Sequence, residues 1–316
     1  MTALRTNFDF SRWRSYAISP PVLLKPQSPE DITRKSKPGL FQNCVYYIPY
    51  KTLEEQGISF ADFALSKSYY NELAFLFEDA SSRNPYTKKE ADFVQAIARR
   101  YLQNPHSLLD IACGAGRHGR ELSNMGYKVV GVDGSEKLLE IARSKDKKTT
   151  YKQFDMRSFE LGQQFDVAIC LWDAFPYLSQ KEDVELFLEK CLKHIKKGGL
   201  LIIDFRNYFK EDLKPLWLEG TLSFGQLEVK YTGRRQDINF TDRVSESVFV
   251  YNVKNIQTRE TGIFVDQELV RTYSLDDLKG FFKDDFKVLG AHGDFDLENK
   301  FDPKKSERLI VVAQVT

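Results

Sequence analysis

The sequence is poor in cysteine and histidine and lacks any long apolar run. It holds four cysteines, at positions 44, 113, 170 and 191, and four histidines, and neither set has the spacing of a metal site. No stretch of 18 apolar residues is present, and the first 20 residues lack the apolar core of a signal peptide. These absences predict a cytoplasmic protein with reduced thiols, no bound metal and no membrane partner.

A strong charge of either sign is also missing. The net charge is +1, whereas a general nucleic-acid binder would concentrate basic residues on one face, so we expect no nucleic-acid partner. The length of 316 residues, of which 42% are hydrophobic, is ample for one elaborated domain or two. Composition leaves the oligomeric state open between monomer and homodimer.

The first 40 residues differ from the rest of the chain. They contain seven Lys or Arg residues, three acidic residues and five prolines. One interpretation is a poorly ordered arm. The other is a segment that folds over an active site, which the aromatic stretch CVYYIPY (44–50) favours because disordered tails seldom carry such residues. We therefore predict that residues 1–85 form an N-terminal extension and lid.

The most informative motif lies in LLDIACGAGRHGRELSNMGYKVVGVDGS (108–135). An apolar run over 108–112 and a second one that ends at Asp133 predict two buried strands, with a helix over 117–125 between them. The first turn follows a G-x-G-x-x-G pattern, formed by Gly114, Gly116 and Gly119. This pattern is typical of a nucleotide-binding β-turn-α-β unit, although glycines also serve as plain turn residues.

Two carboxylates distinguish between nucleotide cofactors. Asp110 lies inside the first predicted strand, where a dinucleotide-binding fold normally has an apolar residue and where a carboxylate can reach an ammonium group. Asp155, in YKQFDMRSF (151–159), follows the third predicted strand and can accept a hydrogen bond from the amine of an adenine. A pyrophosphate would gain nothing from an anion at Asp110. The pattern therefore favours a cationic amino-acid nucleoside.

The segment DIACGAG (110–116), followed by Asp133 and Asp155, resembles the class I S-adenosylmethionine-dependent methyltransferases. The resemblance covers residues 88–215 and 268–316. It implies that Gly114 and Gly116 let the backbone approach the methionine part, that Asp133 binds the ribose hydroxyls, and that Asp155 and Met156 face the adenine. The implied cofactor is S-adenosyl-L-methionine, and the predicted cofactor-binding residues are Asp110, Ala112, Gly114, Gly116, Arg117, Asp133, Gly134, Asp155, Met156 and Leu171. Ala112 stands where the family usually has glycine.

The chain around this motif predicts an α/β fold. Helical spacing over 93–101 and 184–195 alternates with apolar strands over 165–171 and 200–205. Gly198–Gly199 is predicted to end the second of these helices. Strands that alternate with helices imply a parallel sheet with right-handed crossovers.

The pattern changes after the fifth predicted strand. Period-two stretches between residues 222 and 273 predict an antiparallel insertion. A capped helix then begins at Ser274, and strands follow over 286–290 and 308–315. The predicted fold class is α/β: a Rossmann-like seven-stranded methyltransferase sheet with an antiparallel β insertion and an N-terminal extension that serves as a lid. The predicted parts are the extension 1–85, the first core part 86–215, the antiparallel β cap 216–273 and the last core part 274–316.

Charged residues directly follow two predicted strands. Asp173 lies in LWDAFPYL (171–178), and Arg206 lies in DFRNYF (204–209). Such residues seldom serve a core, and ligands bind at the carboxyl ends of the strands in open α/β sheets. The alternative for Arg206 is an ion pair with a nearby acid such as Asp204. For three neighbouring aromatic residues the alternative is ordinary core packing: Trp172, Phe175 and Tyr177.

The segments AICLWDAFPYL (168–178) and KKGGLLIIDFRNYF (196–209) are similar to those of the glycine and glycine/sarcosine N-methyltransferases. The amino-sugar N,N-dimethyltransferases share the same plan. In the glycine enzymes the arginine of the second segment holds the substrate carboxylate, and the resemblance carries this role to Arg206. Asp173 replaces a family asparagine and Tyr177 a family histidine, so a larger amine than glycine is expected.

These observations predict methyl transfer to an amine nitrogen of an amino-acid-like or other natural-product acceptor. The predicted catalytic residues are Asp173, Tyr177, Arg206 and Tyr70. Asp173 or Tyr177 would position the amine or take its proton, and Trp172 or Tyr70 would stabilise the sulfonium by cation–π contact. Tyr70 lies in SYYNELAFLF (68–77), which is otherwise a plain amphipathic helix.

Two further expectations concern the surroundings of the site and its chemistry. The antiparallel cap, with part of residues 40–85, is predicted to cover the acceptor pocket because aromatics of both segments need a common apolar partner. The alternatives are an O- or C-methyltransferase, a nicotinamide oxidoreductase and, least supported, a non-catalytic S-adenosylmethionine-binding module.

Overall fold

The computed structural model describes residues 70–71, 73–210, 216–239 and 241–316. Residues 1–69 of the predicted extension 1–85, including the aromatic stretch 44–50 and Cys44, lie outside the described residues. The chain divides into two compact units. Among the described residues, unit 1 holds 216–235 and 247–267, and unit 2 holds the remainder.

Unit 2 is built around a seven-stranded sheet with the order β10-β11-β5-β4-β1-β2-β3. The strands β1 to β5 pair in parallel, whereas β11 runs antiparallel to both β5 and β10. Their bounds are β1 Ser107–Ile111, β2 Lys128–Asp133, β3 Thr150–Gln153, β4 Phe165–Cys170, β5 Ile195–Arg206, β10 Phe286–Gly293 and β11 Arg308–Val315. The strand order reverses between β1 and β4, and such a switch point is where open α/β sheets bind ligands.

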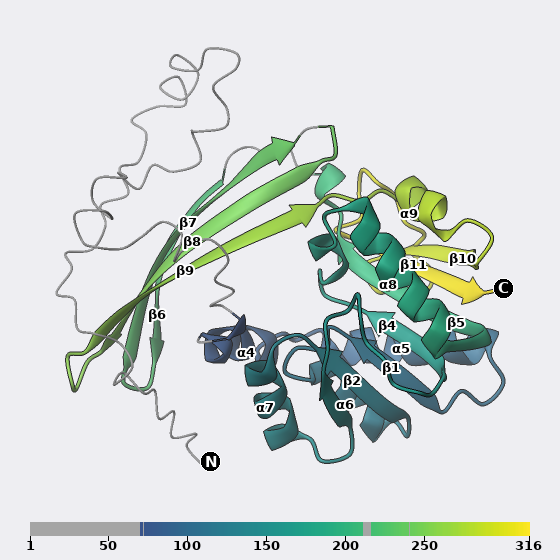
Figure 1. The fold of residues 1–316 in the computed structure, drawn as a ribbon, viewed down its shortest axis with the longest axis horizontal. Helices are drawn as coiled ribbons and strands as arrows, with labels where there is room; N and C mark the ends of the chain where they lie inside the picture. Colours follow the sequence, from purple (N-terminus) through teal and green to yellow (C-terminus); the bar gives the residue numbers. More distant parts are fainter. Residues whose placement is uncertain (1–69, 72, 211–215, 240) are drawn as a thin grey trace. The chain divides into compact units, whose positions relative to one another are not determined.

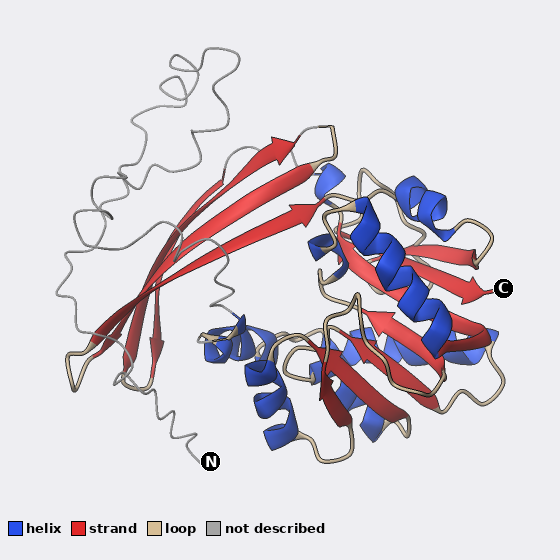
Figure 2. Ribbon diagram, in the orientation of Figure 1, coloured by secondary structure: helices blue, strands red, loops and turns tan. Residues whose placement is uncertain are grey.

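Helices cover both faces of this sheet (Figures 1 and 2). α5 (Thr87–Tyr101) and α6 (Arg117–Asn124) pack on one face against side chains such as Leu108 and Ile202. α8 (Lys181–His194) and α9 (Leu275–Phe282) pack on the other face against side chains such as Leu109 and Ile203. Successive residues of a strand thus pack into the cores on opposite faces of the sheet, because side chains alternate along a strand with a period of two.

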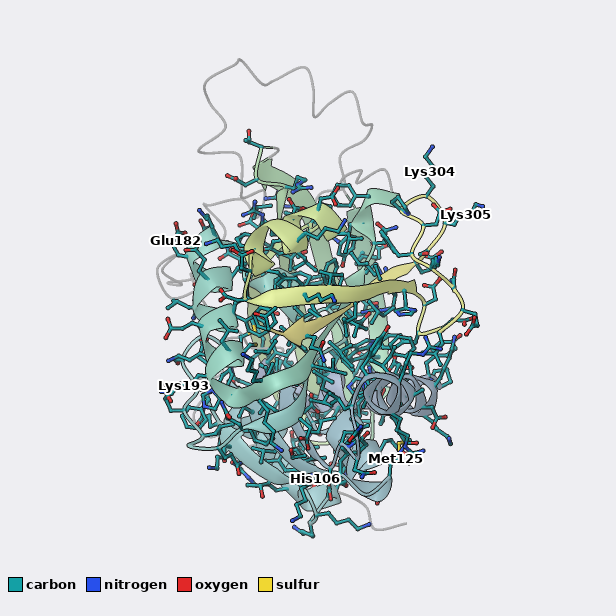
Figure 3. All side chains as sticks on the ribbon, turned by 90° about the vertical axis from the view of Figure 1, so that its right-hand side faces the viewer. His106, Met125, Glu182, Lys193, Lys304 and Lys305 are labelled. Carbon is teal, nitrogen blue, oxygen red and sulfur yellow. The ribbon has the colours of Figure 1, made fainter. Side chains whose placement is uncertain are left out.

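The outer surface of α8 is charged. Glu182 and Lys193, near its two ends, are exposed and project outward in Figure 3. The inner surface carries Val184, Phe187 and Cys191, which are fully buried. The helix therefore has the amphipathic pattern that the sequence predicts.

The predicted end of α8 was wrong by a few residues. The helix ends at His194, and β5 already begins at Ile195, which pairs with Phe165. Gly198 and Gly199 lie within β5 and do not cap the helix. The reason is tertiary: the buried His194 ring binds the backbone of Lys190 and of Leu161, and sheet pairing takes over at the next residue.

Two α-helices and two short 3₁₀ turns complete unit 2. α4 (Ala74–Ser82) overlaps the end of the segment 68–77, whose plain interpretation was an amphipathic helix. α7 (Glu136–Lys145), which the sequence patterns did not single out, is capped by Ser135. Short 3₁₀ turns follow β4 and β5, at Phe175–Tyr177 and Tyr208–Lys210.

The insertion forms a second sheet with the order β6-β7-β8-β9. Its strands are β6 Leu216–Phe224, β7 Leu227–Asn239, β8 Val244–Asn255 and β9 Thr261–Arg271. β6 and β7 pair antiparallel through a hairpin at Gly225, whose φ of 53° suits a tight turn. The predicted antiparallel insertion is thus confirmed, while its coverage of the acceptor pocket stays a prediction. In the described part of the chain, no helix is both long and apolar enough to cross a membrane.

Candidate cofactor and acceptor site

The turn between β1 and α6 has a left-handed backbone at three residues. Ala112, Gly114 and Gly116 have φ values of 56°, 55° and 75°, in the region that favours glycine. A Cβ atom on Gly116 would lie 2.3 Å from the hydroxyl oxygen of Tyr151. One on Gly114 would lie 3.0 Å from the ring of Phe77. Backbone conformation and space together therefore require both glycines.

Asp133 lies where β2 ends and holds the glycine turn from the side. Its carboxylate accepts hydrogen bonds from the backbone N–H groups of Gly114 and Ser135, each at 2.8 Å. Gly134, between them, is exposed. These bonds fix the carboxylate beside the turn, at the carboxyl end of the strand, where the resemblance places the ribose.

A buried charged cluster lies behind the turn. Arg117, the first residue of α6, donates to Glu90 of α5 at 2.5 Å and to Thr87 at 2.8 Å. Glu90 also bonds His118 at 2.8 Å. Burial alone would raise the pKa of Glu90, but His118 and Arg117 hold it at about 2. Burial and the Arg117 charge lower the pKa of His118 to about 4, so this imidazole is neutral at pH 7.

Two atoms of this region are buried without a hydrogen-bond partner among the described residues: Asp110 Oδ2 and Arg117 Nη2. Burial raises the pKa of Asp110 to about 7, although the Arg117 charge and the Gly119 N–H oppose that rise. Buried polar atoms are nearly always bonded in native proteins, so each exception calls for a reason. A ligand that carries both charges would supply one.

The turn after β4 is also left-handed. Trp172 and Asp173 have φ values of 59° and 67°, which is rare for residues with side chains of this size. The Trp172 N–H donates to Asp204 at 2.8 Å. The indole ring of Trp172 lies 4.3 Å from the guanidinium carbon of Arg117. Arg117 thus makes a cation–π contact with this ring, whose predicted contact with a sulfonium stays a prediction.

Asp204 does not pair with Arg206, so that alternative was wrong. The fork of Arg308, from β11, takes both oxygens of Asp204 at 2.7 and 2.8 Å and reaches Asp173 at 3.2 Å. The other oxygen of Asp173 accepts the Arg206 N–H at 2.6 Å. The Arg206 side chain is exposed at the end of β5 and has no ion pair within the described part of the chain.

Tyr70 and Tyr177 meet, although 107 residues separate them in sequence. Their hydroxyl oxygens are 2.5 Å apart. Burial raises the pKa of Tyr177 well above its usual range, and Tyr70 and Glu268, both hydrogen-bonded to it, raise it further. Tyr70 also packs edge-on against Phe77, with ring centroids 5.4 Å apart. The structure thus brings two predicted catalytic residues together, next to an aromatic residue of α4.

The residues predicted to face the adenine, together with Leu171, make contacts within the protein. Asp155 is exposed and binds Arg157 through both oxygens at 2.7 and 2.8 Å. Met156 packs at the edge of the core beneath α8. Leu171 is only 4% exposed and belongs to the core on the α5 and α6 face.

Comparison with known proteins shows which proteins this chain resembles. Residues 108–199 match the family model described as a methyltransferase domain. A dTDP-3-amino-3,6-dideoxy-alpha-D-glucopyranose N,N-dimethyltransferase from Streptomyces fradiae is 29% identical, over 50% of this chain and 62% of that protein. A glycine/sarcosine N-methyltransferase from Parasynechococcus marenigrum is 32% identical, over 40% of this chain and 46% of that protein. The matched region is thus similar to the class I S-adenosylmethionine-dependent methyltransferases.

Solved structures share the fold of this chain. The S-adenosylmethionine-bound amino pentose methyltransferase of calicheamicin biosynthesis from Micromonospora echinaspora gives a TM-score of 0.60 at 20% identity, covering 76% of this chain and 97% of that one. A sugar N-methyltransferase from Streptoalloteichus gives 0.63 at 22%, covering 79% and 94%. At these identities the likeness concerns the fold. The Streptomyces and Parasynechococcus proteins match this chain over about half to two thirds of their own length.

The polar groups of this site fit S-adenosylmethionine, the cofactor that the resemblance implies. The amino-acid part of that molecule carries one ammonium and one carboxylate. The two unpartnered buried atoms, on Asp110 and Arg117, belong to side chains of the opposite charges. The glycine turn, in which added Cβ atoms would collide, leaves the backbone open to a close approach.

Three residues that help to build the site were missed from the sequence: Glu90, Asp204 as the partner of Arg308, and Arg308 itself. Each left a signal. Glu90 shares the apolar face of α5 with Phe93, Val94 and Ile97, and is 4% exposed. A charged residue at an apolar helix position indicates a buried partner. Asp204 likewise interrupts an apolar stretch of β5, and Arg308 begins the largely apolar strand β11.

Proposed function

We propose that the protein transfers a methyl group from S-adenosylmethionine to the nitrogen of a small amine that carries an anionic group. The observation that carries this proposal is the exposure of the Arg206 side chain. Asp204, the alternative partner of Arg206, is bound by Arg308, and the Arg206 guanidinium is exposed at the carboxyl end of β5. An arginine fork matches carboxylate and phosphate oxygens in bidentate geometry.

The cofactor half of the site is assigned from unpartnered atoms. Arg117 Nη2 is proposed to bind the carboxylate of the methionine part, and Asp110 Oδ2 its ammonium group. Asp133 is proposed to receive the ribose hydroxyls while its bonds to Gly114 and Ser135 keep it in place. When bound, S-adenosylmethionine supplies an electrophilic methyl group on a sulfonium whose departure leaves a neutral thioether.

The acceptor half must hold a neutral amine in line with the methyl group. Alignment of this kind can contribute roughly 7–11 kcal/mol to lowering the barrier. The raised pKa of Tyr177 keeps its hydroxyl protonated at neutral pH, so it acts as a hydrogen-bonding relay and not as a phenolate base. The proton of the amine is proposed to pass along Tyr70 and Tyr177 to the carboxylate of Glu268, which is hydrogen-bonded to Tyr177.

Asp173 receives a positioning role in this proposal. One of its oxygens accepts the backbone N–H of Arg206 and the other faces Arg308. Both oxygens are thus engaged by groups of the protein, which suits a side chain that positions the turn. We therefore assign proton transfer to the tyrosine pair.

Two acceptor classes meet these requirements, and the relatives illustrate both. Glycine and sarcosine carry a carboxylate, and dTDP-linked amino sugars carry a diphosphate. Labelled S-adenosylmethionine would be supplied with matched pairs that differ in the anion: glycine with glycinamide, and a dTDP-linked amino sugar with the free amino sugar. We expect transfer to an anionic member and little to its neutral partner. Equal transfer to both members of a pair would remove the anion requirement.

The cofactor assignment has its own measurement. Calorimetric titrations with S-adenosylhomocysteine and with NADH should show binding of the first and none of the second. Binding of NADH without binding of S-adenosylhomocysteine would overturn the proposal. Mass spectrometry and NMR of the product would identify the methylated atom, and an O- or C-methyl product would replace the nitrogen assignment.

A further inference from the structure

The strained turn at the end of β4 needs support from elsewhere in the fold. Trp172 and Asp173 are consecutive residues with left-handed backbone, at φ values of 59° and 67°. Conformations of this kind persist only where the surroundings determine them, and they cluster at functional sites. The groups that hold this turn are therefore part of whatever the turn does.

Three side chains hold the turn: Asp173, Asp204 and Arg308, which we call the latch. Asp204 is fully buried and accepts the Trp172 N–H at 2.8 Å. Arg308 binds Asp204 through two nitrogens and Asp173 through a third. Its side chain is 17% exposed. Arg308 comes from β11, directly opposite Arg206 in the sheet, so β5 and β11 together carry the latch.

The latch sets the position of one aromatic ring. The backbone of Trp172 is held by Asp204, and its ring lies 4.3 Å from the guanidinium carbon of Arg117 and 5.9 Å from the Phe77 ring centroid. Arg117 is thus fixed from two sides, by the Trp172 ring and by the carboxylate of Glu90. Its Nη2 is left without a partner among the described residues.

We propose that Arg308 is a positioning residue for the cofactor, which it never needs to touch. By holding the β4 turn it keeps the Trp172 ring against Arg117, and this contact orients the spare Nη2 for the carboxylate of the methionine part. The inference rests on the proposed function, because it requires that S-adenosylmethionine binds beside Arg117.

The test compares two ligands that differ in one group. S-adenosylhomocysteine carries the carboxylate, and decarboxylated S-adenosylhomocysteine lacks it. Arg308→Lys keeps a positive charge beside Asp204 but loses the fork. We expect the Kd for S-adenosylhomocysteine to rise about tenfold, the size of one lost charge-assisted hydrogen bond, while the Kd for the decarboxylated ligand changes less than about twofold.

A matched control is Arg243→Lys. Arg243 likewise binds both oxygens of one carboxylate, Asp277, at 2.7 Å in the same compact unit, and Trp172 does not depend on that pair. This variant should leave both Kd values unchanged. If Arg308→Lys weakened the binding of both ligands equally, the effect would be a general structural one. If it left both Kd values unchanged, Arg308 would have no positioning role. Either result overturns the inference.

A second variant covers the case in which Arg308→Lys does not fold. Asp173 is 32% exposed, and Asp173→Asn keeps an oxygen for the Arg206 N–H while it loses the ion pair with Arg308. We expect the same selective loss at about threefold, since this contact is the longest of the latch. No selective loss would overturn the inference. Failure of the wild-type protein to bind S-adenosylhomocysteine would instead overturn the proposed function, and the inference with it.

Discussion

The two halves of the site are built by different means. The half after β1 and β2 is local: Gly114 and Asp133, joined by a hydrogen bond, are 19 residues apart. The half after β4 and β5 is held by contacts over long distances in sequence, such as Asp204 with Arg308, 104 residues apart. The first half therefore rests mainly on contacts that are close in sequence, and the second on ion pairs between distant strands. The predictions below separate these two kinds of construction.

Removal of Asp204 should have the largest effect. Asp204→Ala leaves Arg308 buried with one weak partner and leaves the Trp172 N–H unpaired, so the free energy of unfolding should fall by about 3–5 kcal/mol. Urea denaturation measures this loss. Asp155→Ala, which breaks an exposed pair with Arg157, is the control and should cost no more than about 1 kcal/mol. Similar losses in the two variants would contradict the contrast between buried and exposed pairs.

Asp110 should destabilise the protein at high pH. Its pKa is raised by burial from 3.8 to about 7, so between these values the folded state binds more protons than the unfolded chain. The free energy of unfolding therefore falls as the pH rises through this window, and the cost is complete above it. At pH 8, Asp110→Asn should raise the free energy of unfolding by roughly 3 kcal/mol.

The same variant should weaken S-adenosylhomocysteine binding, because the neutral amide attracts an ammonium less strongly. Denaturation curves at pH 5 and pH 8, with calorimetry at pH 8, test both statements. A more stable variant that binds as tightly as the wild type would show that Asp110 does not contact the ligand.

Arg206 should matter for turnover and not for stability. Arg206→Lys keeps the charge and loses the fork, so kcat/KM for an anionic acceptor should fall by about ten- to a hundredfold. S-adenosylhomocysteine binding and urea denaturation should be unaltered, because the exposed guanidinium has no ion pair among the described residues. Arg83→Lys, at the exposed residue that follows α4, is the control. Normal turnover by Arg206→Lys would end the anion-binding assignment.

The glycines of the motif should separate into two classes, with the smallest effects of the series. Gly116 has a φ of 75° and no room for a Cβ, so Gly116→Ala should cost about 1–2 kcal/mol of stability. Gly119 lies inside α6, and a Cβ there would meet atoms no closer than 3.5 Å. Gly119→Ala should therefore be neutral or stabilising by up to about 1 kcal/mol. Thermal denaturation of the two variants measures both effects. An equal loss of stability in Gly119→Ala and Gly116→Ala would contradict this distinction.

The contrast between the halves also explains what the sequence could predict. The strands, the glycine turn and Asp133 follow from periodicity and turn chemistry within 108–135, and the structure confirms them. The pairing of Asp204 with Arg308 could not be predicted, because it requires knowledge that β11 lies beside β5. From the sequence alone, Asp204 was therefore a plausible ion-pair partner for Arg206. The helix end at His194 was misplaced for the same reason, since sheet pairing of Ile195 overrode the local glycine signal.

The distance in sequence between β5 and β11 has a consequence for the order of folding. Closing a flexible loop of 104 residues costs about 1.5 kcal/mol more chain entropy than closing one of 19. Contacts that are distant in sequence also slow folding. The glycine turn can therefore form early, from a contiguous segment, whereas the β4 turn acquires its support only when β11 docks. During refolding the polypeptide should pass through a stage in which the nucleoside-binding side is assembled and the acceptor side is not.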